Sequence, residues 1–135
     1  MRLIHGLFVF VLFASAAQAD QSTQNGNMWL KLSDGQKTFY TLGFLDGMTY
    51  GSPGTDVSPT MKKFDKVTPQ QIMDGYDKIY ADYRNRLIPM LNAIDVVIDS
   101  IHGASDANTE IHLEWYRKKI SRYLDESSAK EPQSK

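Results

Sequence analysis

Apolar residues recur every three or four positions in four stretches of the chain, which is the spacing of one face of an α-helix. These stretches span residues 33–50, 69–84, 89–102 and 108–124. The second stretch carries the clearest apolar stripe, made of Ile72, Met73, Tyr76, Ile79, Tyr80 and Tyr83. The pattern therefore predicts an all-α, compact single domain of about four helices, with the helix that begins at residue 69 as its central element.

The tyrosines of this stripe have two interpretations. Tyrosine offers a large apolar ring and a polar tip, so a row of tyrosines suits a core whose hydroxyl groups reach the rim. The alternative is a groove for carbohydrate or peptide, because the same rings present flat apolar area to a ligand. The core interpretation is the one expected here.

Local signals mark where the predicted helices begin and end. Two pairs match the capping box, in which each side chain bonds the backbone N–H of the other residue: Ser33 with Gln36, and Thr68 with Gln71. Pro69 stands at a first helical position, where its missing N–H costs no hydrogen bond, and Pro89 opens the third helix. Gly103 is typical of the left-handed residue that follows a helix.

The segments between and around the helices differ in composition. Residues 51–67 hold two prolines and two glycines without helical periodicity, which predicts an irregular loop. Residues 20–32 begin with a polar run and are predicted to be a mobile mature N-terminus. Residues 125–135 have the composition of a disordered tail, so the helical domain is expected to span 33–124.

Two glycines four residues apart, Gly43 and Gly47, lie on the predicted first helix. Each costs about 1 kcal/mol relative to alanine inside a helix, so a packing reason for them is expected. Together they would form a groove that another helix approaches closely. A ligand lying in that groove is the alternative.

The first residues have the pattern of an export signal. Arg2 is followed by the apolar run Leu7 to Phe13, and Ala17-Gln18-Ala19 supplies the small residues that a signal peptidase requires. The apolar run is too short for a membrane anchor, which needs about 20 apolar residues. The sequence therefore predicts a signal peptide over residues 1–19 and a periplasmic or secreted bacterial protein that has no membrane contact after cleavage.

Composition excludes several classes of activity. The chain has no cysteine, which rules out a cysteine nucleophile and a thiolate metal site. Its net charge is −1, and about −2 after loss of Arg2, which gives no electrostatic basis for nucleic-acid binding. His102 and His112 lie on different predicted helices, without the paired spacing of a zinc site. With no serine hydrolase motif either, we expect a protein that is not an enzyme and that has no metal site and no cofactor.

Surface recognition is the remaining kind of activity. Tyrosine, tryptophan and arginine are enriched at the energetic centres of protein interfaces. The candidate partner surface consists of Trp29, Tyr83, Arg84, Arg86 and Trp115. Alternatively, Trp29 packs against the start of the first helix and the arginines pair with nearby aspartates.

A resemblance to known proteins rests on spaced residues between 29 and 103. They are Trp29-x-x-Leu32-Ser33, Lys37-x-x-Tyr40-x-x-Gly43-x-x-x-Gly47, Val67-Thr68-x-Gln70 and Tyr80-Ala81-Asp82-x-x-Asn85-x-x-Ile88-Pro89, then an apolar helix that ends in Gly103. This pattern resembles small exported bacterial all-helical proteins. More distantly it is similar to the Rap/Tai immunity proteins, which neutralise peptidoglycan-amidase effectors in the periplasm. Those proteins usually carry paired cysteines, one of them where Lys37 or its neighbours stand here.

The resemblance and the residues together imply an exported helical binding module, immunity-like in character, that recognises a protein partner in the cell envelope. The resemblance carries over no effector-contacting residue. A periplasmic stress or chaperone-like helical protein is the alternative. The two capping boxes favour a stable binder over a protein that acts by partial unfolding, and the oligomeric state is left open.

Overall fold

The computed structural model describes residues 24–50 and 62–129. Its helical elements are α1 (Gly26–Trp29), α2 (Asp34–Tyr50), α4 (Pro69–Ala81), the 3-10 turn η2 (Tyr83–Asn85), α5 (Met90–Ile101) and α6 (Asp106–Ser128). The predicted all-α architecture is confirmed. In this described part no helix is long and apolar enough to cross a membrane. The predicted signal peptide, residues 1–19, and most of the predicted loop, residues 51–61, lie outside the described residues.

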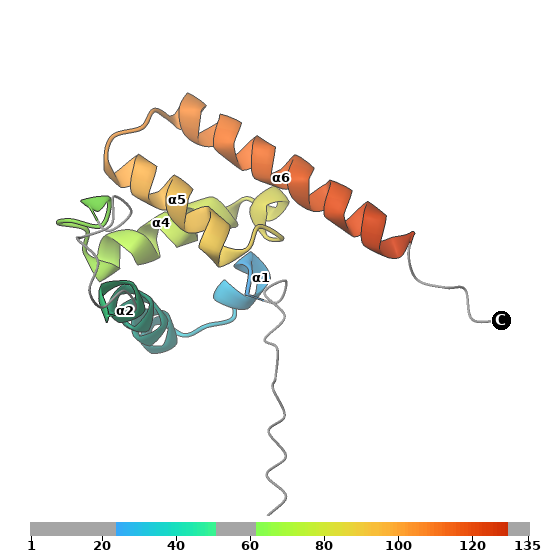
Figure 1. Cartoon of the computed structure of the whole chain (residues 1–135). Helices are drawn as coiled ribbons and strands as arrows, with labels where there is room; N and C mark the ends of the chain where they lie inside the picture. The colour runs from blue at the N-terminus through green and yellow to red at the C-terminus, as the bar shows by residue number, and fades with distance from the viewer. Residues whose placement is uncertain (1–23, 51–61, 130–135) are drawn as a thin grey trace, which may run out of the picture.

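Helix α4 lies at the centre of the fold. It contacts α1, α2, α5 and η2, and α6 packs on the far side of α5. Figure 1 shows α4 and α5 side by side, α2 below them and α6 running across the top and past the rest of the molecule. The apolar stripe of α4 is buried in this arrangement, and half of the residues of α5 are buried with it.

Tyr76 and Tyr80 of α4 belong to the core, as expected, but the prediction was wrong for Tyr83, which lies beyond α4 in η2 and is 75% exposed. Tyr76 and Tyr80 stack with ring centroids 5.9 Å apart. Their hydroxyl groups donate 3.0 Å hydrogen bonds to the backbone carbonyls of Met90 and Ile88. Burial raises the pKa of both phenols far above the usual range. These bonds join α4 to Ile88 in the connection and to Met90 at the start of α5, and they give each buried phenol hydroxyl an acceptor.

The predicted helix boundaries are close to those observed. Thr68 and Gln71 form the reciprocal capping box before Pro69. The Ser33 box is also present, although its Gln36 N–H bond is long at 3.4 Å. Gly103, which follows the C-cap residue His102 of α5, has φ +92°, in the left-handed region that a residue with a Cβ atom seldom adopts.

Two boundaries were wrong. The predicted helix 69–84 ends at Ala81, because Asp82 is extended and caps the separate turn η2. The predicted tail, residues 125–135, begins too early, because α6 continues to Ser128. The hydroxyl groups of Ser127 and Ser128 donate to the carbonyls of Tyr123 and Leu124 one turn earlier, the local back-bond that serine makes inside a helix.

The prediction of a mobile N-terminus over residues 20–32 was wrong for the described residues 24–32. Asn25 caps α1 and pairs with Pro89 in an isolated bridge. Trp29 then enters the core, where it is fully buried between Tyr40 and Tyr76. The polar run that precedes α1 gave no sign of this docking, because the partners lie far along the chain.

The expectation that a helix packs closely on Gly43 and Gly47 was also wrong. A Cβ atom at either position would meet no heavy atom of the described residues within 4 Å. Close approaches occur instead at two other glycines. A Cβ on Gly26 would lie 2.2 Å from the ring of Tyr80, and one on Gly75 would lie 2.4 Å from Val97.

We expect Gly43→Ala to raise the free energy of unfolding by about 0.5–1 kcal/mol. Gly43 is exposed inside α2, so alanine adds helix propensity and limits the unfolded chain without meeting a neighbour. Denaturant unfolding followed by circular dichroism measures the change. Gly75→Ala is the matched control and should destabilise, because its new methyl overlaps Val97. A Gly43→Ala protein that is less stable than the wild type would show that this face has a close neighbour.

Candidate functional site

The turn η2 presents two of the candidate recognition residues at one corner of the molecule. Tyr83 is 75% exposed. Arg84, which follows it, is held by Asp82: its Nε and Nη2 atoms donate to Asp82 Oδ2 at 2.9 and 2.6 Å. The Arg84 backbone N–H also donates to Asp82 Oδ1 at 2.9 Å. The side-chain bonds first, and then the backbone bond, lower the pKa of the Asp82 carboxyl group to about 2.

A buried asparagine, Asn85, connects the turn η2 to the helices beneath it. Asn85 is 2% exposed, and its Nδ2 donates to the carbonyl of Ile79 in α4 at 2.9 Å. Its Oδ1 accepts a 2.7 Å bond from Arg117 of α6. Arg117 in turn pairs with Glu110, with 2.5 Å between Nη2 and Oε1. This one side chain therefore connects the turn both to α4, which precedes it, and to α6, which lies far along the sequence.

An open groove of about 520 Å³ runs from this corner along α6. It is lined by Arg84, Glu110, Glu114, Arg117, Lys118 and Ser121. Three cations and two carboxylates line the groove and pair with one another: Arg117 pairs with Glu110, Lys118 with Glu114, and Arg84 lies 3.8 Å from Glu110. We call Tyr83, Arg84 and this groove the η2 surface. Its ion pairs position the side chains without giving the groove a strong net charge.

The structure separates the five predicted surface residues. Tyr83 and Arg84 lie together on η2. Arg86 is partly buried, and its Nε donates a 3.4 Å hydrogen bond to the carbonyl of Tyr80, so it stabilises the turn. The prediction that Trp29 belongs to the partner surface was wrong, because its ring is fully buried and its Nε1 donates to Asp77 at 2.7 Å.

Trp115 is exposed but belongs to a different face. It follows buried Leu113 by two residues and therefore points about 200° away around α6. Its ring packs edge-on against Tyr116, with 4.9 Å between centroids, and Lys119 Nζ lies 5.0 Å above it. Trp115 does not line the groove beside Arg84.

Sequence reasoning missed the residues that hold the η2 surface in place. The sequence pattern suits Asn85 to a turn and Glu110 to a solvated polar face of its helix, and it did not single out Arg117. One signal was present: Arg117 lies one turn after Leu113, on the side of α6 that faces the body. An arginine at such a position needs a polar partner inside the fold, and Asn85 is that partner.

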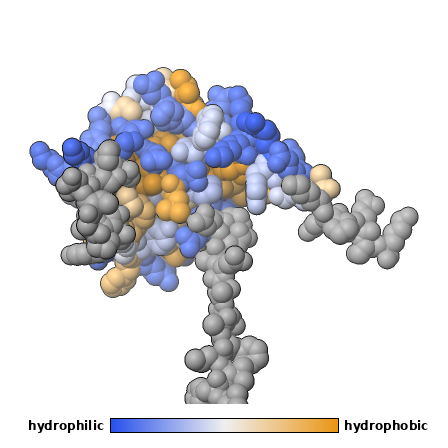
Figure 2. Space-filling model, in the orientation of Figure 1, coloured by the Kyte–Doolittle hydropathy of each residue, from blue (hydrophilic) through white to orange (hydrophobic). Residues whose placement is uncertain are grey.

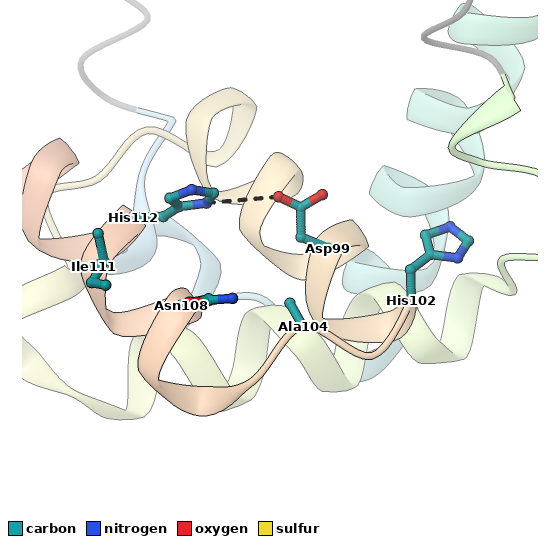
Figure 3. A pocket seen from close by; sticks show the side chains of 6 residues that line it. All are labelled: Asp99, His102, Ala104, Asn108, Ile111 and His112. Carbon is teal, nitrogen blue, oxygen red and sulfur yellow. Dashed lines mark ion pairs between the residues drawn. The ribbon is translucent and has the colours of Figure 1, made fainter.

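A second pocket lies where α5 turns into α6. It has a volume of about 360 Å³ and is lined by Asp99, His102, Ala104, Asn108, Ile111 and His112. Figure 3 shows His112 facing Asp99, at 3.7 Å between Nδ1 and Oδ2, while His102 lies on the other side of Asp99. The ring of His102 bonds the carbonyl of Lys63 at 2.8 Å.

This pocket offers limited chemistry. A histidine and a carboxylate can move a proton, but no serine, threonine or lysine side chain lines the pocket as a nucleophile. Among the described residues no three histidine, aspartate or glutamate side chains are grouped so that they could hold a metal ion. The η2 surface is therefore the stronger candidate for function.

Comparison with known proteins does not add to this picture. No family model, no curated protein and no solved structure matches the chain.

Proposed function

We propose that this chain is a protein-binding module of the bacterial cell envelope and that it recognises its partner through the η2 surface. The observation that carries the proposal is the combination of an exposed Tyr83 with a rigid support beneath it. Tyr83 and Arg84 project from a single turn whose Asn85 is buried and bonded to both α4 and α6.

The residue types suit protein recognition. Tyrosine and arginine are enriched among the few residues that carry most of the binding energy of an interface. The guanidinium of Arg84 donates three hydrogen bonds to the carboxylate of Asp82, so ordering it on binding costs less conformational entropy than ordering a free arginine. Preorganisation of this kind favours a specific partner over loose association.

The exported location and the immunity-like character come from the signal-peptide pattern and from the distant resemblance to the Rap/Tai proteins. They define the partner that we propose, a protein of the envelope such as a secreted effector. The absence of the paired cysteines does not bear on the η2 surface, because its support consists of hydrogen bonds and ion pairs.

A second candidate function, a stress or chaperone-like protein, is favoured by α2. Phe39 of α2 is 77% exposed and Leu42 is 41% exposed. Figure 2 shows hydrophobic residues at the lower left edge of the molecule, where α2 lies. A chaperone would use such a face to hold unfolded chains, and that activity would depend on Phe39 rather than on Tyr83.

The experiment is affinity capture from periplasmic extract with the chain from residue 20 onward, the form expected after signal cleavage. Tyr83→Ala and Arg84→Ala are compared with Trp115→Ala, a matched exposed aromatic on another face of the molecule. A captured protein is identified by mass spectrometry, purified and titrated directly. We expect both η2 variants to raise its dissociation constant by about tenfold or more, and Trp115→Ala to leave it unchanged.

Circular dichroism melts of the variants verify that they are folded. Equal affinity of the wild type and both η2 variants for the partner would contradict the proposal. Suppression of aggregation that requires Phe39 and not Tyr83 would favour the chaperone-like alternative. Turnover of a peptidoglycan fragment by the purified chain would contradict a function limited to binding.

A further inference from the structure

A third pocket lies between α4, α5 and α6. It forms because α6 packs on α5 and η2 and leaves a space beside α4. We call it the α4–α6 pocket, and its volume is about 220 Å³. Pockets for drug-sized ligands have volumes of about 300–1,000 Å³, so the ligand of this pocket would be a smaller molecule.

The floor of the α4–α6 pocket is apolar. It is lined by one buried side chain from each helix: Ile79 of α4, Val97 of α5 and Leu113 of α6. These side chains are already fixed in the core, so a ligand that contacts them does not have to order them. The aliphatic part of a small molecule would be removed from water on this floor, which favours its binding.

The rim of the pocket is mostly acidic. Three carboxylates line the pocket beside a single lysine, Lys78: they belong to Asp82, Asp106 and Glu110. Arg84 and Arg117, which pair with two of these carboxylates, line neighbouring grooves and not this pocket. One lysine and three carboxylates give the lining a net charge of −2. The pocket therefore favours a cation over an anion.

Two of the carboxylates have an oxygen to spare. Asp106 and Glu110 are four residues apart on α6, so they lie on the same side of the helix and repel each other. Asp106 pairs with Lys78 through Oδ1, and Glu110 pairs with Arg117 through Oε1. Within residues 24–50 and 62–129, Asp106 Oδ2 and Glu110 Oε2 make no hydrogen bond and no ion pair. A cation between these two oxygens would reduce the repulsion.

Lys78 does not fill the pocket with its own side chain. That side chain is 70% exposed, and its Nζ lies 3.2 Å from Asp106, whose side chain is 92% exposed. The ion pair is therefore at the outer edge of the rim. Such an exposed pair contributes little free energy, so a ligand can compete with it.

A buried hydroxyl group beside the pocket also lacks a partner. Thr109 lines the pocket, and its Oγ1 is buried without a hydrogen bond to any described part of the chain. Buried side-chain hydroxyls are usually paired. An unpaired one at this place indicates that the wall of the pocket accommodates a further polar group.

We propose that the α4–α6 pocket binds a small primary alkylammonium ion. Its aliphatic part lies on the apolar floor, and its ammonium group lies between the carboxylates of Asp106 and Glu110. An ammonium group has three donors, so it can bond both carboxylates at once. This site goes beyond the proposed function, because it requires neither Tyr83 nor an envelope partner. The pocket is small and its rim is exposed, so we expect a dissociation constant in the millimolar range.

The test is a titration of the chain from residue 20 onward with n-butylammonium chloride at constant ionic strength, followed by the amide chemical shifts in nuclear magnetic resonance spectra. We expect shifts that saturate with a dissociation constant of about 1–10 mM and that are largest near Lys78, Ser100 and Thr109. The compound n-butanol has the aliphatic chain without the charge, and ammonium chloride has the charge without the chain. Each should bind about tenfold more weakly or less.

Three variants test the charges of the rim. Asp106→Asn should raise the dissociation constant of n-butylammonium about two- to fivefold, because it removes one of the two carboxylates. Lys78→Gln should lower it by a similar factor, because it removes the competing cation. Glu126→Gln is the control: it removes a carboxylate that is exposed on α6 but does not line the pocket, and it should change nothing.

Shifts that rise without saturation, or n-butanol that binds as tightly as n-butylammonium, would overturn the proposal. The same holds if Asp106→Asn leaves the dissociation constant unchanged or if Lys78→Gln raises it.

These results are separable from those for the envelope partner. Asp106 is the test position because Glu110 also lines the η2 surface, whereas Asp106 does not. Asp106→Asn should leave partner capture unchanged, and Tyr83→Ala should leave the titration with n-butylammonium unchanged. Failure of either experiment therefore leaves the other proposal standing.

Discussion

Replacement of Trp29 by alanine is expected to lower the free energy of unfolding by about 3–5 kcal/mol, the usual cost of truncating a buried aromatic side chain. Trp29 is fully buried and contacts Tyr76 with 4.8 Å between ring centroids. It also orders two charged groups: its Nε1 bonds Asp77, and Lys37 lies 5.2 Å above its ring and 2.6 Å from the same carboxylate. A cavity here would release α1 and the start of α2 from α4.

Urea unfolding followed by circular dichroism measures this loss. Because small domains are stable by about 5–15 kcal/mol, the variant should unfold at much lower urea or lose its structure. Trp29→Phe is the matched variant: it keeps an aromatic ring in the core but removes the indole N–H and part of the ring volume. It should lose about 1.5–3 kcal/mol, the value of a hydrogen bond to a charged group, which is still less than the loss expected for alanine. A loss below about 1 kcal/mol for Trp29→Ala would mean that α1 is not docked as described.

Replacement of Asn85 by alanine is expected to cost about 2–3 kcal/mol. The substitution removes the donor to the Ile79 carbonyl and the acceptor for Arg117, so a buried carbonyl and a largely covered guanidinium lose a partner together. The side chain of Arg117 is only 18% exposed, so water replaces the lost bond poorly. Chemical unfolding of the variant gives the magnitude.

Asn108→Ala is the control for this substitution. Asn108 is exposed in the first turn of α6, and its replacement should change stability by no more than about 0.5 kcal/mol. Asn85→Ala should also weaken partner capture in a chain that is still folded, because Tyr83 and Arg84 lose the support beneath them. Wild-type stability in Asn85→Ala would show that the turn does not depend on this side chain.

The helix ends could be predicted from sequence because their bonds are local. Thr68 and Gln71 bond each other across three residues, and Gly103 ends α5 through its own backbone conformation. Such features are stable in any tertiary context that contains the helix. The same reasoning gave the apolar stripe of α4, whose spacing alone defines one face.

The functions of individual glycines and of Trp29 could not be predicted in this way. Gly43 and Gly47 have the spacing of a packing face, yet the close approaches occur at Gly26 and Gly75. Nothing in the local sequence distinguishes these positions, because the atoms that a Cβ would meet belong to Tyr80 and Val97 on other elements.

For the candidate site, too, one part could be predicted from the sequence and the other only from the tertiary structure. Composition identified Tyr83 and Arg84 as recognition residues, and their place in a polar turn exposes them. Only the tertiary structure showed that Arg117, 32 residues after Asn85, supports that turn, and that Trp115 points elsewhere. Amphipathic spacing and capping chemistry thus determined the helices of this chain. The packing of α6 on α5 and η2 decided which exposed side chains are held in place, because this support depends on bonds between residues that are distant in sequence.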